Sequence, residues 1–144
     1  MVLFKRRREF PLRISDVMVK DVVVVGENET VQRIAELMIN NNIGSVLVTD
    51  SEGKLRGIVT ERNLVYVVAR GLDPSRLKAW EVMTENPIVA RPDDLMIDVI
   101  NKMRELNVRH MPVVDRDGRP IGMVSFRDIV DAAAMLLTIL YRPR

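Results

Sequence analysis

Two short polar strings near the carboxyl end of the chain could bind a small polar ligand. Ser125 and Asp128 are three residues apart at the predicted start of a helix, and Arg109 and His110 precede an earlier strand. A carboxylate accepts two hydrogen bonds from a cis-diol, and a hydroxyl with main-chain N–H groups at a helix N-terminus favours an anion. These residues predict a binding site. Asp is also a good helix cap, so a purely structural role for Asp128 stays open.

The chain lacks the residue sets of common catalytic sites. It has no Cys and one His, and it contains neither Gly-x-x-x-x-Gly-Lys-[Ser/Thr] nor Gly-x-Gly-x-x-Gly. A Ser/His/Asp set would need His110, which has no evident base-orienting partner. A metal cluster would need a second His. We therefore expect no enzyme and no metal site.

A predicted β-hairpin positions the polar strings. The turn Asp115-Arg116-Asp117-Gly118 separates two apolar runs, and its Gly supplies the positive φ that such a turn needs. Arg109 and His110 precede the first strand of this hairpin. Ser125 closes the second strand, and a helix follows from Arg127 to about Tyr141.

The same unit occurs twice. A shift of 65 positions aligns Val17-Met18 with Val82-Met83, and the register then continues without a gap to Val65 and Val130. The matching pairs fall on turn glycines, strand interiors and helix faces. The chain is therefore a tandem repeat whose copies should stack on each other.

Each repeat is predicted to run strand–helix–strand–strand–helix. In the first, Thr30 should cap a helix that Asn40–Asn42 end, and a second helix over 62–70 should turn Val65 and Val68 inward. In the second, Asp93 or Asp94 should cap the helix. The expected division is a basic tail over 1–13, repeats over 14–71 and 80–135, a connection over 72–79, and the helix end with the C-terminal tail over 136–144.

The distribution of charge and of apolar residues limits the kinds of partner that we expect. The net charge is +2, but residues 1–13 carry +4 and 141–144 carry +2, so the rest carries −4. A mildly acidic body argues against a broad nucleic-acid-binding face.

The last helix has an apolar stripe that exceeds what one repeat can cover, which predicts a homodimer. The run Ala132–Leu140 is far shorter than the roughly 18–20 residues that span a bilayer, so no membrane partner is expected.

Residues 14–135 resemble a pair of CBS domains (cystathionine β-synthase domains), also called a Bateman module. The strongest features are two Gly-x-x-[Thr/Ser]-x-x-[Asp/Asn] strings, Gly57–Asn63 and Gly122–Asp128, in one register of the repeat. The Val-Met pairs and Arg109–Asp115 support the likeness. The resemblance implies an α/β fold in which two CBS domains pack with pseudo-twofold symmetry.

The resemblance also implies a regulatory protein that binds adenosine-containing ligands between its repeats. It places Asp128 at the ribose hydroxyls, Ser125 at ribose or phosphate, and Arg109 with His110 at the phosphate. The implied adenine wall consists of Met111, Pro112, Ile88 and Val89. The predicted set is completed by positions in the first repeat and by a basic residue at each helix start: Thr60, Asn63, Ile43, Ser45, Arg62 and Arg127.

The first repeat departs from the family pattern. It has Asn63 where Asp is commoner, and Ile43-Gly44-Ser45 where the second repeat has Val108-Arg109-His110. A charged acceptor binds a diol more strongly than a neutral amide. We therefore expect the ribose site at Asp128 to bind more tightly than the one at Asn63.

The expected function is a stand-alone, cytoplasmic sensor of adenine nucleotides (AMP, ADP or ATP) that signals to an effector protein or through its own homodimer. No cofactor is expected beyond this regulatory ligand, with Mg²⁺ accompanying ATP. A structural or protein-interaction module with a degenerate cleft is the alternative. The sequence does not separate AMP from ATP, S-adenosylmethionine or a dinucleotide.

Overall fold

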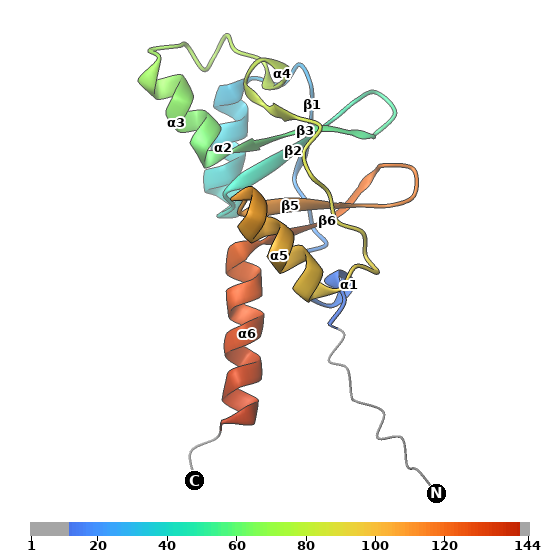
Figure 1. Ribbon diagram of the computed structural model, residues 1–144. Coiled ribbons are helices and arrows are strands. Elements are labelled where there is room, and N and C mark those ends of the chain that lie inside the picture. Colours follow the sequence, from blue (N-terminus) through green and yellow to red (C-terminus); the bar gives the residue numbers. More distant parts are fainter. Residues whose placement is uncertain (1–11, 142–144) are drawn as a thin grey trace, which may run out of the picture.

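Two β-hairpins lie at the centre of the computed structural model, which describes residues 12–141 (Figure 1). The first joins β2 (Ser45–Thr49) to β3 (Leu55–Thr60), and the second joins β5 (His110–Val114) to β6 (Pro120–Ser125). Both pairs are antiparallel and occupy matching positions of the repeat. The predicted tandem α/β architecture is confirmed.

Both hairpin turns are held by the Asp at their start. Asp50 Oδ1 accepts hydrogen bonds from the N–H groups of Glu52 and Lys54 at 2.9 and 3.0 Å, and Asp115 makes the equivalent bonds in the second turn. Gly53 and Gly118 have φ angles of 79° and 80°. Residues with a Cβ are strained there, which explains the Asp-x-x-Gly signal in each repeat.

Helices flank the hairpins in the predicted order. Five further elements belong to the two halves of the molecule, the repeats over 14–71 and 80–135. They are β1 (Val24–Gly26), α2 (Val31–Asn41), α3 (Glu61–Ala69), α5 (Met96–Leu106) and α6 (Phe126–Leu140). Thr30 caps α2 by accepting the N–H of Arg33 at 3.2 Å, and Asn42 ends it in the left-handed conformation. β1 pairs in parallel with β2. The matching strand predicted at Ile88–Ala90 is reduced to one parallel bridge between Ala90 and Val113.

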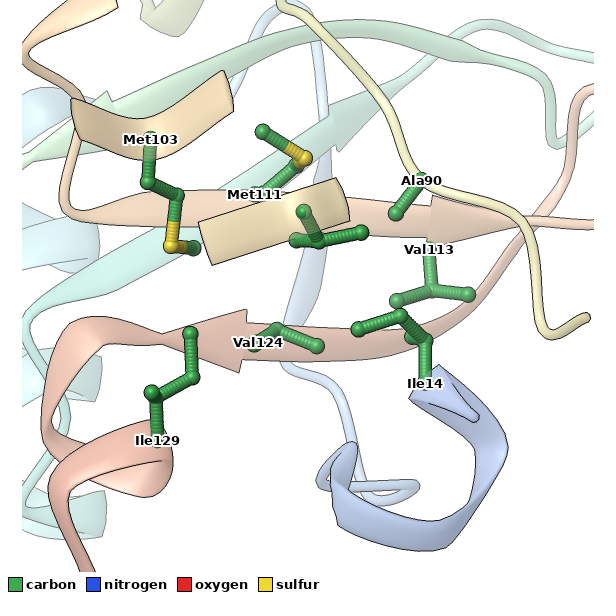
Figure 2. Packing of buried hydrophobic residues seen from close by; sticks show 8 residues of the cluster. Ile14, Ala90, Met103, Met111, Val113, Val124 and Ile129 are labelled. Carbon is green, nitrogen blue, oxygen red and sulfur yellow. The ribbon is translucent and has the colours of Figure 1, made fainter. Parts of the chain in front are cut away.

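The two halves exchange their opening segments. The short helix α1 (Ile14–Val17) opens the first repeat, but Ile14 is buried in the core of the second, against Val113 and Val124 (Figure 2). In the same way α4 (Ala79–Val82) opens the second repeat while Ala79 is buried in the core of the first. Each hydrophobic core therefore needs a segment from the other half.

A strand-like contact follows each exchanged helix. β4 (Thr84–Glu85) pairs with β3 and completes a sheet of order β1-β2-β3-β4. Val19, which matches Thr84 in the repeat, pairs with Met123 on β6 through two hydrogen bonds of 2.9 Å. The halves are joined by hydrogen bonds as well as by apolar contacts.

The Val-Met pairs and the motif glycines fit together across the halves. A Cβ on Gly122 would lie 2.6 Å from Met18 Sδ, and a Cβ on Gly57 would lie 2.9 Å from the carbonyl oxygen of Thr84 and still nearer to Met83 Sδ. Both distances are too short for real contacts. Glycine is required at these positions because the Met-containing segment of the other half lies on the strand.

Several predicted details are wrong. On α3 only Val67 is buried, whereas Val65 and Val68 are 65% and 79% exposed, because one side of this helix faces no other element of residues 12–141. The cap of α5 is Leu95 rather than Asp93 or Asp94. Asp94 Oδ2 instead accepts the N–H of Arg91 at 2.8 Å. No helix within residues 12–141 has the length and apolar character needed to cross a membrane.

Candidate ligand-binding cleft

A cleft of about 550 Å³ opens where the two halves meet, and both contribute to its walls. The first half supplies apolar side chains around β1 and β2: Val22, Val23, Ile43 and Leu47. The second half supplies polar groups at and after the end of β6: Ser125, Arg127, Asp128 and Asp131. The first-half wall also contains the carboxylates of Asp21 and Glu61, so apolar and polar groups both face the cleft. Such a lining suits a ligand that has a flat apolar part and a polar part.

Ser125 and Asp128 hold each other at the start of α6. Asp128 Oδ2 accepts hydrogen bonds from the N–H and the hydroxyl of Ser125 at 2.9 and 2.8 Å, and Ser125 Oγ accepts the N–H of Asp128 at 3.1 Å. Ser125 is therefore the helix cap, and Asp128 is its partner in a capping box. Both residues also line the cleft. The second carboxylate oxygen of Asp128 makes no hydrogen bond within residues 12–141, which leaves it for a ligand.

His110 lies at the boundary between the halves. It begins β5 opposite Ser125, and its Nε2 would be 3.2 Å from a Cβ placed on Gly44 of the other half. Burial lowers the pKa of His110, and the nearby carboxylates of Glu61 and Asp128 oppose that shift. The imidazole is therefore mostly neutral near pH 7. A side chain at position 44 would crowd it and require a small shift.

The first half repeats the capping geometry without the charge. Asn63 Oδ1 accepts hydrogen bonds from the N–H and the hydroxyl of Thr60 at 2.7 and 3.0 Å. The polar atom left over is Nδ2, which only donates. Thr60 and Asn63 lie outside the 550 Å³ cleft.

The structure brings together six of the predicted site residues. Those that line the cleft are Asp128, Ser125, Arg127, His110, Ile43 and Ser45. Those that lie elsewhere are Arg109, Met111, Pro112, Ile88, Val89, Thr60, Arg62 and Asn63. Met111 and Pro112 are buried within β5, and Arg109 and Ile88 are exposed.

Sequence reasoning missed part of the first-half wall and several acidic side chains. Val22 and Val23 match Pro87 and Ile88 under the shift of 65, so placing Ile88 at a site implied Val23 at the matching one. Asp21, Glu61 and Asp131 also line the cleft. Nothing local in the sequence marks these three, because their proximity depends on how the halves pack.

The family model for the CBS domain matches residues 14–70 and 79–135. Together with the paired α/β halves and the cleft between them, this match shows that the chain belongs to the CBS-domain family, as a tandem pair. Such pairs are generally regulatory.

Among curated relatives, an uncharacterized protein (MK0525) of Methanopyrus kandleri is 31% identical over 86% of this chain and 64% of its own length. A homoserine O-acetyltransferase of Methanococcus vannielii is 35% identical over 82% of this chain but only 24% of its own length. The chain therefore spans about a quarter of that enzyme and about two thirds of the uncharacterized relative.

Solved structures share the fold over nearly the whole described chain. The CBS-domain pair of protein MJ0100, in complex with 5′-methylthioadenosine and S-adenosyl-L-methionine, has a TM-score of 0.80 and 28% identity, covering 86% of this chain and 97% of that one. The CBS-domain protein PAE2072 of Pyrobaculum aerophilum, complexed with AMP, also has a TM-score of 0.80. It is 27% identical, and the match covers 90% of this chain and 98% of that one.

Proposed function

We propose that this protein is a regulatory module that binds an adenosine-containing ligand in the cleft between its CBS domains. The observation that carries the proposal is the Ser125–Asp128 pair, which faces a cleft with an apolar wall from the other half. The similar structures bound to AMP or to S-adenosyl-L-methionine support the same ligand class.

The cleft residues divide naturally among the parts of such a ligand. The free oxygen of Asp128 accepts from the ribose hydroxyls, and hydrogen bonds to a charged group contribute about 1.5–3 kcal/mol. Val22, Val23 and Ile43 cover the adenine ring. The N-terminus of α6, with Arg127 and His110, is then nearest to the 5′ substituent, which is a phosphate if the ligand is AMP, ADP or ATP.

Binding would signal through the arrangement of the halves. A ligand that touches both walls stabilises the arrangement in which both contacts form, and a partner can bind that arrangement selectively. The output would pass to an effector protein or through a homodimer. In this proposal the module is cytoplasmic and has no catalytic role of its own.

A direct test is to purify the full chain without added nucleotide and measure its absorbance near 260 nm. Any bound compound is extracted with acid and identified by mass spectrometry, and the stripped protein is titrated with adenosine compounds by calorimetry. We expect an adenosine compound in the extract or micromolar binding on titration. A protein that carries none and binds none would instead be a structural or interaction module with a degenerate cleft.

A further inference from the structure

The charged side chains of the cleft are predominantly acidic. Asp21, Glu61, Asp128 and Asp131 line it, against the single guanidinium of Arg127. The ion pairs formed among residues 12–141 use other carboxylates, such as those of Glu36 and Asp117. His110 adds little positive charge near pH 7, because burial lowers its pKa. The lining therefore carries a net charge of about −3 at this pH.

The carboxylates come from three sides. Asp21 precedes β1, Glu61 is the first residue of α3, and Asp131 lies one turn after Asp128 on α6. A ligand that fills a cleft of about 550 Å³ lies within roughly one screening length, about 8 Å at physiological salt, of most of them. A 5′ substituent next to Arg127 therefore still lies in a cleft whose lining carries more carboxylates than cations.

We propose, resting on the adenosine site argued above, that this cleft selects an adenosyl ligand whose 5′ substituent carries a positive charge, such as a sulfonium, over a nucleoside polyphosphate. A triphosphate brings up to four negative charges into a lining that is already negative. In water, one pair of unit charges at 4 Å changes an affinity about fivefold. A cationic substituent gains from the same carboxylates that repel a phosphate chain.

The experiment compares ligands that differ in charge at one atom. S-adenosyl-L-methionine has a sulfonium, whereas S-adenosyl-L-homocysteine has a neutral thioether and the same amino-acid group. Calorimetry on the full chain should show that S-adenosyl-L-methionine binds at least threefold more tightly than S-adenosyl-L-homocysteine. ATP, with or without Mg²⁺, should bind at least tenfold more weakly than either compound. Raising the salt concentration should weaken the sulfonium compound selectively.

Variants locate the effect in the cleft. Asp131→Asn and Glu61→Gln should each reduce the preference for the sulfonium and strengthen ATP binding roughly threefold. Glu105→Gln, on the exposed side of α5, is the matched control and should change neither. Urea unfolding checks that the variants are folded.

The outcomes separate this proposal from the one that it rests on. If adenosyl compounds bind but ATP is tightest, or if the neutralised variants keep the wild-type ratios, the charge selection is wrong and the adenosine site stands. If no adenosine compound binds the wild-type chain, both proposals fail.

Discussion

Asp128 and Asn63 occupy matching positions of the two halves, but they offer a ligand opposite hydrogen-bonding groups. Asp128 keeps a charged acceptor after satisfying Ser125, whereas Asn63 keeps only an amide donor after satisfying Thr60. Asp128→Ala should therefore weaken binding of an adenosine ligand by roughly 10–100-fold, and Asn63→Ala by less than about tenfold. Calorimetric titration of both variants measures this difference.

Asp128→Asn is the matched control for the capping role. It retains an acceptor for Ser125, so its free energy of unfolding should stay close to the wild-type value while ligand affinity falls. If Asn63→Ala were the more damaging change, or if neither mattered, the assignment of the ribose to Asp128 would be wrong.

Gly122 is required by a neighbouring segment rather than by its own backbone conformation. A Cβ there would lie 2.6 Å from Met18 Sδ and 3.2 Å from the carbonyl oxygen of Val19. Gly122→Ala should lower the free energy of unfolding by about 1–3 kcal/mol, the usual cost of overpacking. Adding Met18→Ala should recover part of that loss, and Gly26→Ala, with no atom within 4 Å of its Cβ, is the control. Urea denaturation of the three variants and the wild type would show whether the contact matters.

His110 should make stability depend on pH. Burial, the largest cause, holds its pKa in the folded protein below the ordinary 6.5, although Glu61 and Asp128 act in the opposite direction. As the pH falls below 6.5, the unfolded chain therefore takes up a proton before the folded chain does, and the stability gained from keeping His110 neutral is lost.

The comparison is between the wild type and His110→Asn in urea titrations at about pH 7.5 and pH 5.5. The wild type should lose more free energy of unfolding over this interval than the variant, since every other titratable group is present in both. Equal losses would show that the folded and unfolded pKa values of His110 are the same.

The helix α6 presents more apolar surface than the rest of the described chain covers. It extends away from the body in Figure 1, and Met135, Leu137, Ile139 and Leu140 are all more than half exposed. Such a patch favours association. We expect light scattering to show a dimer at micromolar concentration, and Leu140→Glu to shift it toward monomer. Ile97→Glu, an equally exposed apolar position on α5, should leave the dimer intact, and a monomeric wild type would contradict the expectation.

Local signals located the elements better than their buried faces. The Asp-x-x-Gly turns, the Thr30 cap and the Asn42 stop were all readable, because each depends on residues close in sequence. The inward faces were harder to predict. Val65 and Val68 have the spacing of a buried stripe, but burial depends on whether another element covers that side of α3, which periodicity does not specify.

At the level of the whole molecule, sequence reasoning identified the architecture and six of the residues that line the cleft. Ser125 and Asp128 could be found because they follow each other on one turn. Met111 and Pro112 point to opposite sides of β5 and both are buried, and their predicted contact with adenine stays a prediction. Glu61 and Asp131 could not be found, because they line one cleft only once the two halves pack together.

Because α1 and α4 are exchanged, the molecule resembles a segment-swapped dimer whose two subunits are joined in one chain. Ile14 and Ala79 are each buried in the opposite half, so each core already holds the two halves together. Neither core therefore needs an unbroken chain at the exposed residue Ser75. A protease site inserted between Ser75 and Arg76 should therefore yield two fragments that remain together. Size-exclusion chromatography of the cleaved protein should show one peak at the elution volume of the uncleaved protein. Separate peaks for the two fragments would mean that the packing of α1 and α4 is too weak to keep them together.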